Sequence, residues 1–315
     1  MNSTFPFPLS PLSLGTATYG AEPDESKAFA MLDRFLEAGG NQLDTARVYS
    51  DWIPGEPGRS EKLIGRWLKS RGCRERMMIA TKGGHPPMDQ MERGRMSEAE
   101  LLHDIDLSRK ALGVDTIDLY WLHRDDRNQP IGQLLGILES FREKGWISTY
   151  GGSNFSTQRL VAAYQFSREQ KIPGFVASQP MACLGAQYRK PMEIPLLERL
   201  DEAGEAFHTR TDMALFPYSS QANGYYEKVA RWGAGSEKLK DHPFNTNENN
   251  AIATRLIALS AESGYSVSTL TLAWWRTKPY PVHPIIGCRT IEQLEDSLDS
   301  LRVDDETLHA LSSVD

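Results

Sequence analysis

Four polar side chains follow three apolar runs of this chain, and their types suit the transfer of a proton to a carbonyl oxygen. Asp44 ends the run NQLD, Lys82 follows MMIAT, His123 follows IDLYWL, and Tyr49 lies five residues after Asp44. A carbonyl that accepts a hydride develops negative charge on its oxygen, and the phenol of Tyr49 can protonate it. Because a neighbouring ammonium favours the phenolate, we expect Lys82 to bring the pKa of Tyr49 from its usual value towards neutrality.

The two remaining side chains complete this set. A buried lysine keeps its charge only beside a partner, and Asp44 can be the counter-ion of Lys82. His123 can donate a hydrogen bond that polarises the same carbonyl oxygen. The hydride must come from a cofactor, because no side chain donates one. A lyase or aldolase that uses Lys82 as a Schiff base is an alternative interpretation.

Eight short apolar runs alternate with helical stretches, a pattern typical of repeated βα units and a parallel sheet. We predict strands at 12–16, 41–44, 77–81, 116–122, 147–152, 174–179, 213–218 and 283–287. Eight such pairs without a linker predict one α/β domain over residues 1–315, a closed (β/α)8 TIM barrel. In such a barrel the ends of the strands that carry Asp44, Lys82 and His123 share one face.

Several residues are typical of helix ends. Helix starts are predicted at Asp24, Ser60, Ser97 and Ser156, with Glu100 completing a capping box at Ser97. Gly39, Gly113, Gly145 and Gly264 stand where a glycine would end a helix.

Two polar stretches, at about 50–60 and 219–249, are predicted to be long loops over the C-terminal face of the barrel. We expect Tyr19, Trp52 and Arg124 to contact the substrate near this face. An indole beside charged groups suits a polyol or sugar carbonyl at least as well as a bulky apolar one.

The composition excludes several functional classes. The chain has 315 residues and a formal net charge of −7, and it lacks the basic patch of a nucleic-acid binder. No apolar stretch is long enough to span a membrane, and the first residues do not resemble a secretory signal. Three distant cysteines suit a reducing compartment, so we expect a cytoplasmic protein. The seven histidines have no metal-binding HExxH spacing, so no metal is expected, and the oligomeric state cannot be derived.

The cofactor site must be built without the common nucleotide motifs, because the chain has neither a GxGxxG nor a P-loop sequence. Ser153, Asn154, Gln179 and Tyr218 end the fifth, sixth and seventh predicted strands, and they would suit a carboxamide and a flat ring. Near the last strand, Thr290 can cap a helix and Arg289 lies at its positive end. This arrangement predicts a phosphate site, although an exposed arginine at a helix start would have the same sequence.

The sequence resembles the aldo-keto reductases over nearly its whole length. The resemblance is carried by SLGTATYG, LDTARVYSD, IATK, LYWLH, GGSNF, ASQPMA, FPYSS and IIGCRTIEQLEDSL. It implies an NAD(P)H-dependent oxidoreductase of a small aldehyde or ketone, with the catalytic tetrad Asp44, Tyr49, Lys82 and His123 and Tyr49 as the general acid. The cofactor contacts that it implies are Gly15, Thr16, Asp44, Ser153, Asn154, Gln179, Tyr218, Ser219, Gln221, Gly224, Gly287, Cys288, Arg289, Gln293, Asp296 and Ser297.

Within this resemblance, Arg289 would meet the 2′-phosphate of the cofactor, so we predict NADPH, with NADH as the alternative. The segment FPYSSQANGYY lacks the proline of the family pattern Y-S-P-L, and EDS replaces the common EEN. A second hypothesis is a redox-sensing regulatory subunit that resembles the channel-associated members of the family. The short segment before the first predicted strand makes this second function unexpected.

Overall fold

The computed structural model describes residue 5 and residues 8–185 and 197–314. Within these residues eight parallel strands form one sheet, in the order β7-β6-β5-β4-β3-β2-β1-β8. The strands are β1 (Ser13–Gly15), β2 (Gln42–Asp44), β3 (Met78–Gly83), β4 (Ile117–Leu122), β5 (Ile147–Ser153), β6 (Ala177–Gln179), β7 (Ala214–Leu215) and β8 (Ile285–Ile286). Each lies inside or overlaps one of the runs predicted to be a strand, so the prediction of eight parallel strands is confirmed.

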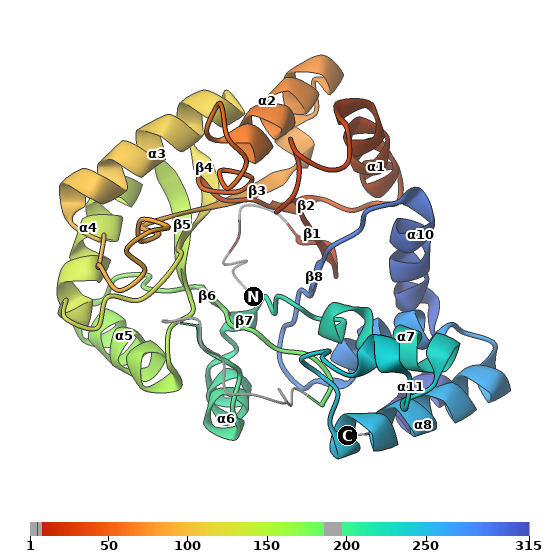
Figure 1. Ribbon diagram of the computed structural model, residues 1–315. Coiled ribbons are helices and arrows are strands. Elements are labelled where there is room, and N and C mark those ends of the chain that lie inside the picture. The colour runs from red at the N-terminus through yellow and green to blue at the C-terminus, as the bar shows by residue number, and fades with distance from the viewer. Residues whose placement is uncertain (1–4, 6–7, 186–196, 315) are drawn as a thin grey trace.

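The sheet curls until its two edge strands, β7 and β8, approach each other (Figure 1). Leu215 of β7 forms an isolated parallel bridge with Val282, just before β8. Three backbone hydrogen bonds of 2.8 to 3.0 Å join the β7 segment to residues 281–285. The sequence order of the strands is therefore also their spatial order around the curled sheet.

The helices lie outside the sheet (Figure 1). They are α1 (Glu25–Glu37), α2 (Arg59–Arg71), α3 (Glu98–Leu112), α4 (Ile131–Glu143), α5 (Thr157–Gln170), α6 (Glu202–Thr211), α7 (Tyr225–Trp232), α8 (Asn247–Ser263), α9 (Val267–Ala273), α10 (Ile291–Asp299) and α11 (Asp305–Leu311). Short 3-10 turns are η1 (Arg74–Arg76), η2 (Ala222–Gly224), η3 (Glu237–Leu239), η4 (Trp274–Thr277) and η5 (Ser300–Arg302). In the described part of the chain, no helix is both long and apolar enough to cross a bilayer.

Most predicted helix starts are confirmed. Asp24 and Ser156 cap α1 and α5, and Ser97 forms the expected capping box with Glu100. The prediction at Ser60 was wrong, because α2 begins at Arg59 after a left-handed Gly58. The hydroxyl of Ser60 instead donates to the carbonyl of Thr16 at 2.8 Å, which ties α2 to the end of β1.

The interior of the curled sheet is filled by large side chains. The rings of Trp121 and Phe216 pack edge to face at 5.3 Å, and Phe5 lies 6.3 Å from Phe216. Two larger apolar clusters fill the space between sheet and helices. The sheet therefore encloses packed side chains below the ends of its strands.

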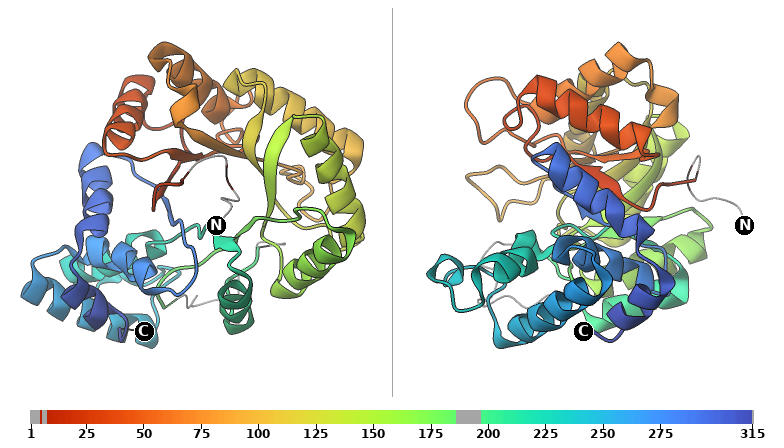
Figure 2. Two further views of the ribbon diagram at one scale, coloured as in Figure 1. Left: turned by 180° about the vertical axis from the view of Figure 1, so that it is seen from behind. Right: turned by 90° about the vertical axis from the view of Figure 1, so that its right-hand side faces the viewer.

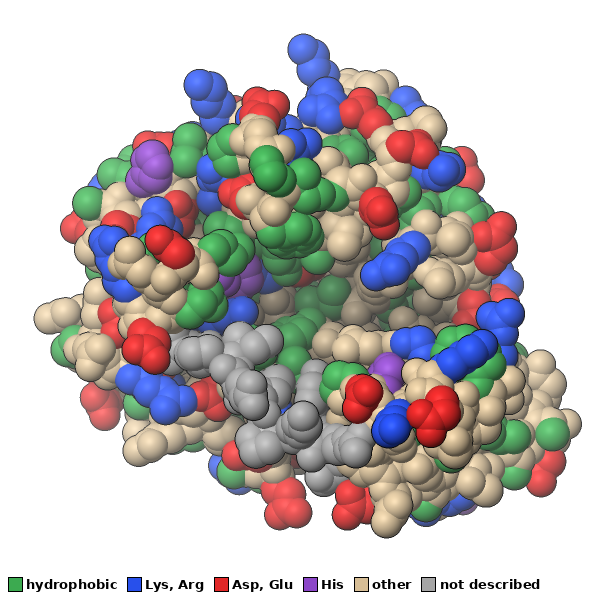
Figure 3. All heavy atoms as spheres, viewed as in Figure 1, with side chains coloured by type: hydrophobic (Ala, Val, Ile, Leu, Met, Phe, Trp, Pro, Cys, Tyr) green, Lys and Arg blue, Asp and Glu red, His purple; other side chains and the backbone are tan. Residues whose placement is uncertain are grey.

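The segments that follow the strands gather on one face, opposite the segment that leads into β1 (Figure 2). Seen from this face, the surface is hollowed at its centre (Figure 3). The stretch at 50–60 is irregular until α2 begins at Arg59. The stretch at 219–249 differs from the loop predicted there, because it contains η2, α7, η3 and the start of α8.

Candidate active site

A buried cluster of charged and polar groups lies at the ends of β2 and β3. The ammonium of Lys82 forms an ion pair with Asp44 and donates to the hydroxyl of Tyr49 at 2.9 Å. A third hydrogen bond joins it to the carbonyl oxygen of Thr45 at 2.8 Å. Lys82 is 1% exposed and Asp44 is 2% exposed, so this lysine is buried with the partner that its charge requires.

The backbone explains how Tyr49 reaches Lys82. After β2 the chain stays paired with β3, since the amides of Thr45 and Arg47 donate to the carbonyls of Ala80 and Lys82 at 2.9 and 3.0 Å. A turn follows, in which the amide of Tyr49 donates to Ala46 at 3.1 Å. The spacing of five residues between Asp44 and Tyr49 therefore returns the phenol to the end of the neighbouring strand.

His123 follows β4 directly, and its amide donates to the carbonyl of Gly83 at 2.8 Å. Its ring packs edge to face with Tyr49 at 5.9 Å and with His85 at 4.7 Å. Its Nδ1 is buried, with no hydrogen-bond partner in the structure. Burial lowers the pKa of His123 well below 6.5, and the neighbouring His85 ring and the charges of Arg124 and Lys82 act in the same direction. His123 is therefore a neutral imidazole.

The pKa of Tyr49 does not move in the predicted direction. Burial raises it, and the charge of Lys82 opposes this effect only in part. The prediction of a phenol acidified towards neutrality was therefore wrong in its net direction, although the sign of the effect of Lys82 was right. Burial would lower the pKa of Lys82, but the charges of Asp44 and Tyr49 and the hydrogen bonds to both raise it. At neutral pH the site holds a phenol and an ammonium.

The polar residues at the ends of β5, β6 and β7 form a network beside this cluster. Ser153 donates to the carbonyl of Gln179 at 3.0 Å, and the hydroxyl of Tyr218 donates to Asn154 Oδ1 at 2.7 Å. Asn154 Nδ2 donates to the carbonyl of His123 at 3.1 Å. Gln179 Nε2 donates to Asp44 Oδ2 at 2.8 Å, which links the network to the ion pair.

Gly15 and Thr16 lie at the end of β1, where a Cβ at Gly15 would be 2.8 Å from Ile285 Cγ2 and 3.1 Å from Ile286 O. Thr16 Oγ1 donates to the carbonyl of Asp44 at 2.9 Å. Tyr19 is almost fully buried. Burial raises the pKa of the Tyr19 hydroxyl, and the nearby Cys288 acts in the same direction. Tyr19 therefore lies near the last predicted cofactor segment, which the sequence did not indicate.

That last segment leads from β8 into α10, which Thr290 caps as predicted. Gly287 faces open space, and the amide of Arg289 donates to Gln293 Oε1 at 2.8 Å. Ser297 Oγ lies 3.7 Å from Cys288 Sγ, and burial raises the pKa of this thiol to about 11. Asp296 accepts hydrogen bonds from Ser266 and Thr269, so it joins α10 to the start of α9.

The segment after β7 contains the predicted cofactor residues Ser219, Gln221 and Gly224, and Gln221 Nε2 donates to Ser268 Oγ at 3.1 Å. Sequence reasoning missed Lys228, which lies one turn further along in α7. Burial and the charge of Arg289 lower the pKa of Lys228, so the two cations lie close enough to repel. The signal was present in YYEKVARW, whose helical period is obscured within a long polar stretch.

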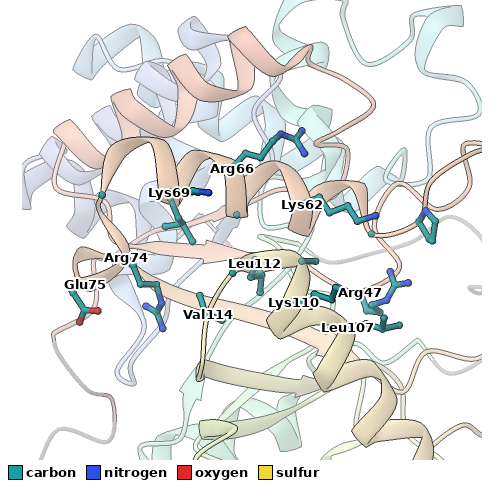
Figure 4. A pocket seen from close by; sticks show the side chains of 17 residues that line it. Arg47, Lys62, Arg66, Lys69, Arg74, Glu75, Leu107, Lys110, Leu112 and Val114 are labelled. Carbon is teal, nitrogen blue, oxygen red and sulfur yellow. The ribbon is translucent and has the colours of Figure 1, made fainter.

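A separate groove of about 770 Å³ lies between α2 and α3 (Figure 4). Leu107, Leu112 and Val114 line it, and the charged residues Lys62, Arg66 and Lys69 of α2 and Lys110 of α3 do so as well. None of the predicted site residues lines this groove. The groove is therefore distinct from the candidate active site.

The site thus places a neutral phenol, a charged amine, a carboxylate and a neutral imidazole at the carboxyl ends of a parallel sheet, the class of site that moves protons at carbonyl or alcohol oxygens. The chain belongs to the aldo/keto reductase family, whose family model matches residues 11–315. It is therefore an oxidoreductase that acts on carbonyl or alcohol groups. Members of the family generally use a nicotinamide cofactor and small carbonyl substrates.

Individual relatives are distant but cover nearly the whole chain. An uncharacterised oxidoreductase, YrpG, of Bacillus subtilis is 29% identical over 97% of this chain and 92% of its own length. Norsolorinic acid reductase stcV of Emericella nidulans is 29% identical over 96% of this chain and 77% of its own length. A putative aryl-alcohol dehydrogenase, AAD14, of Saccharomyces cerevisiae is 27% identical over 94% of this chain and 80% of its own length.

Proposed function

We propose that this protein reduces an aldehyde or ketone to the alcohol with NADPH, and that Tyr49 is the general acid. The observation that carries the proposal is the contact of the Lys82 ammonium with both the Tyr49 hydroxyl and the Asp44 carboxylate. This contact provides a neutral proton donor and, at 2.9 Å, a positive charge that stabilises the phenolate left after proton transfer.

The bound cofactor would supply the hydride. Tyr49 then donates its hydroxyl proton to the carbonyl oxygen as charge develops there, and Lys82 holds the resulting phenolate. Asp44 keeps Lys82 charged inside the protein. His123, as a neutral imidazole, donates a hydrogen bond that orients the carbonyl without competing as an acid. The reverse reaction uses the same groups with Tyr49 as the base.

The groups near β5 to β7 fit a nicotinamide. Ser153, Asn154 and Gln179 offer the amides and hydroxyl that a carboxamide needs, and Tyr218 offers a flat ring. We assign the pyrophosphate to Ser219, Gln221 and Gly224. We assign the adenosine end to the segment from Gly287 to Ser297, with Gly15, Thr16 and Asp44 flanking the nicotinamide.

NADPH is favoured over NADH because two cations, Lys228 and Arg289, lie near each other beside the segments assigned to the cofactor phosphates. No carboxylate in the described chain forms an ion pair with Arg289, whereas a 2′-phosphate between these cations would remove the repulsion. Arg289→Gln should weaken NADPH binding by roughly 10-fold or more and change NADH binding little. Fluorescence titration of both cofactors measures this, with Arg302→Gln as a control at an exposed arginine. Equal losses for NADPH and NADH would contradict the assignment.

The same proposal includes the closed form of the barrel, one domain over residues 1–315 and a cytoplasmic location. The hydrogen bonds between β7 and the segment before β8 support closure. Three buried free cysteines, Cys73, Cys183 and Cys288, support a reducing compartment.

The alternatives have less support. A Schiff-base lysine must lose its charge to attack a carbonyl, whereas the pKa of Lys82 is raised. Borohydride should therefore trap no substrate on Lys82. The family's oxidoreductase relatives favour an enzyme over a regulatory subunit.

The direct test is oxidation of NADPH, followed by absorbance, against aldehydes, aryl ketones, sugars, oxo acids and quinones. Formation of the matching alcohol with at least one substrate is the expected result. Absence of turnover with every carbonyl, by enzyme that binds NADPH, would overturn the proposal.

A further inference from the structure

Arg124 places an uncompensated positive charge beside the proposed acid. It follows His123 directly, and within the described residues its side chain makes one hydrogen bond, from Nη1 to the carbonyl of His123 at 3.3 Å. Its Nε is buried without an acceptor. Among residues 8–185 and 197–314, no carboxylate forms an ion pair with it.

The acidic neighbours of Arg124 already have partners. The carboxylate of Asp125 accepts from Nε and Nη2 of Arg159 at 2.9 and 2.8 Å, and Asp126 accepts from the amide of Asn128 at 3.0 Å. The next arginine of the segment, Arg127, is paired with Glu198. Asp125 and Arg127 are therefore in ion pairs with other residues, Asp126 has a hydrogen bond but no ion pair, and none of the three is paired with Arg124.

The position of this charge points to the substrate. Arg124 is close enough for its charge to act on Tyr49, Tyr218, His85 and His123. Burial lowers the pKa of its guanidinium, and the two tyrosines counteract this. A partly buried guanidinium without a counter-ion is costly for a folded protein, and a bound anion would remove that cost.

We propose that the substrate carries a carboxylate, and that Arg124 binds it while the carbonyl meets Tyr49. This inference rests on the proposed reductase function. A guanidinium binds carboxylates and phosphates through paired N–H groups. One uncompensated cation matches one negative charge, because Lys82 is already paired with Asp44. The monoanionic carboxylate is therefore favoured over a phosphate dianion, and the substrate class is an oxo acid.

Matched pairs of substrates test this inference. The probes are 4-oxobutanoate and 4-carboxybenzaldehyde, each with its neutral methyl ester, and glyceraldehyde 3-phosphate as the phosphate. In the unaltered enzyme, kcat/KM for at least one acid should exceed that of its ester by roughly 10-fold or more. Arg124→Met should raise KM for that acid by about 10²-fold and KM for its ester far less, so that the preference in kcat/KM for the acid is lost. Arg124→Lys should recover part of the loss.

The control is Arg302→Met, which removes one positive charge at an exposed position. This control should leave kcat/KM for the acid and for its ester unchanged. Binding of the unreactive anion benzoate, compared with benzamide, to the NADP⁺-loaded enzyme gives a readout independent of turnover, and Arg124→Met should remove the preference for benzoate. Equal kcat/KM for acids and esters, equal losses of both in Arg124→Met, or preference for the phosphate would each overturn the inference. Those outcomes would contradict only the oxo-acid inference and remain compatible with a reductase. Failure to turn over any carbonyl would instead contradict the proposed reductase function.

Discussion

Tyr49 and Lys82 are in contact, yet burial decides the direction in which the pKa of the phenol moves. The sequence indicated which residues converge, because Asp44, Lys82 and His123 all stand at the same ends of neighbouring strands. It could not indicate the net pKa, since the loss of solvent around a phenol depends on side chains from many segments. For the same reason His85 and the buried position of Tyr19 were not predicted.

The raised pKa of Tyr49 gives the reaction a pH dependence with a definite sign. Reduction needs the protonated phenol, so kcat/KM for reduction should not fall through ionisation of Tyr49 below about pH 10. Oxidation of the alcohol needs the phenolate and should become faster as pH rises over the same range. Initial rates in both directions between about pH 6 and pH 10 measure this. Loss of reduction with an apparent pKa near 7 to 8 that disappears in Tyr49→Phe would show that the phenol is acidified after all.

The elements behave as their end signals predict, except where tertiary contacts take over. The capping box at Ser97 is local, and it formed as the sequence indicated. Ser60 has the residue type of a helix cap, but its hydroxyl donates to the carbonyl of Thr16 at the end of β1. These two residues are 44 positions apart, so no local sequence pattern reveals their contact. Helix α7 was not predicted, because its mixed polar sequence hides the helical period. The position of Lys228 near Arg289 was therefore not predicted either.

Two glycines inside helices should respond in opposite ways to alanine. A Cβ at Gly65 in α2 would lie 2.3 Å from the carbonyl oxygen of Ala111 in α3, so Gly65→Ala should lower the free energy of unfolding by ~1–3 kcal/mol. A Cβ at Gly136 in α4 meets no atom within 4 Å, so Gly136→Ala should raise it by ~0.5–1 kcal/mol. Denaturant titration measures both. The same sign for both variants would contradict the close approach of α2 and α3.

At the scale of the whole molecule, the eight-strand order could be predicted because each strand is followed by a helix along the chain. The predicted closure of the barrel implied that β7 meets the region of β8, but which residues make the contact depends on how far the sheet curls. The same curvature brings Gln179 of β6 to Asp44 of β2, across the interior of the sheet. Several histidines become buried in this architecture.

Burial is the main reason why the pKa values of five histidines, His85, His123, His208, His242 and His283, lie below 6.5. As pH falls below about 6.5, the unfolded chain takes up protons that the folded protein resists, so stability should decrease. Glu61 acts in the opposite direction, because burial raises its pKa to about 6. Five groups outweigh one, so the melting temperature should fall by roughly 2–5 °C from pH 7.5 to pH 5.5. An unchanged or higher melting temperature at pH 5.5 would contradict this.

The central claim is that the Tyr49 hydroxyl, held by Lys82, gives the proton that completes reduction. The most direct measurement is the single-turnover rate of NADPH oxidation in Tyr49→Phe, with a substrate found by the carbonyl panel and NADPH affinity measured in parallel. We predict a rate lower by roughly 10²-fold or more with NADPH affinity retained, because phenylalanine keeps the ring and removes only the proton donor. A variant that reduces the carbonyl at the full rate would contradict the account.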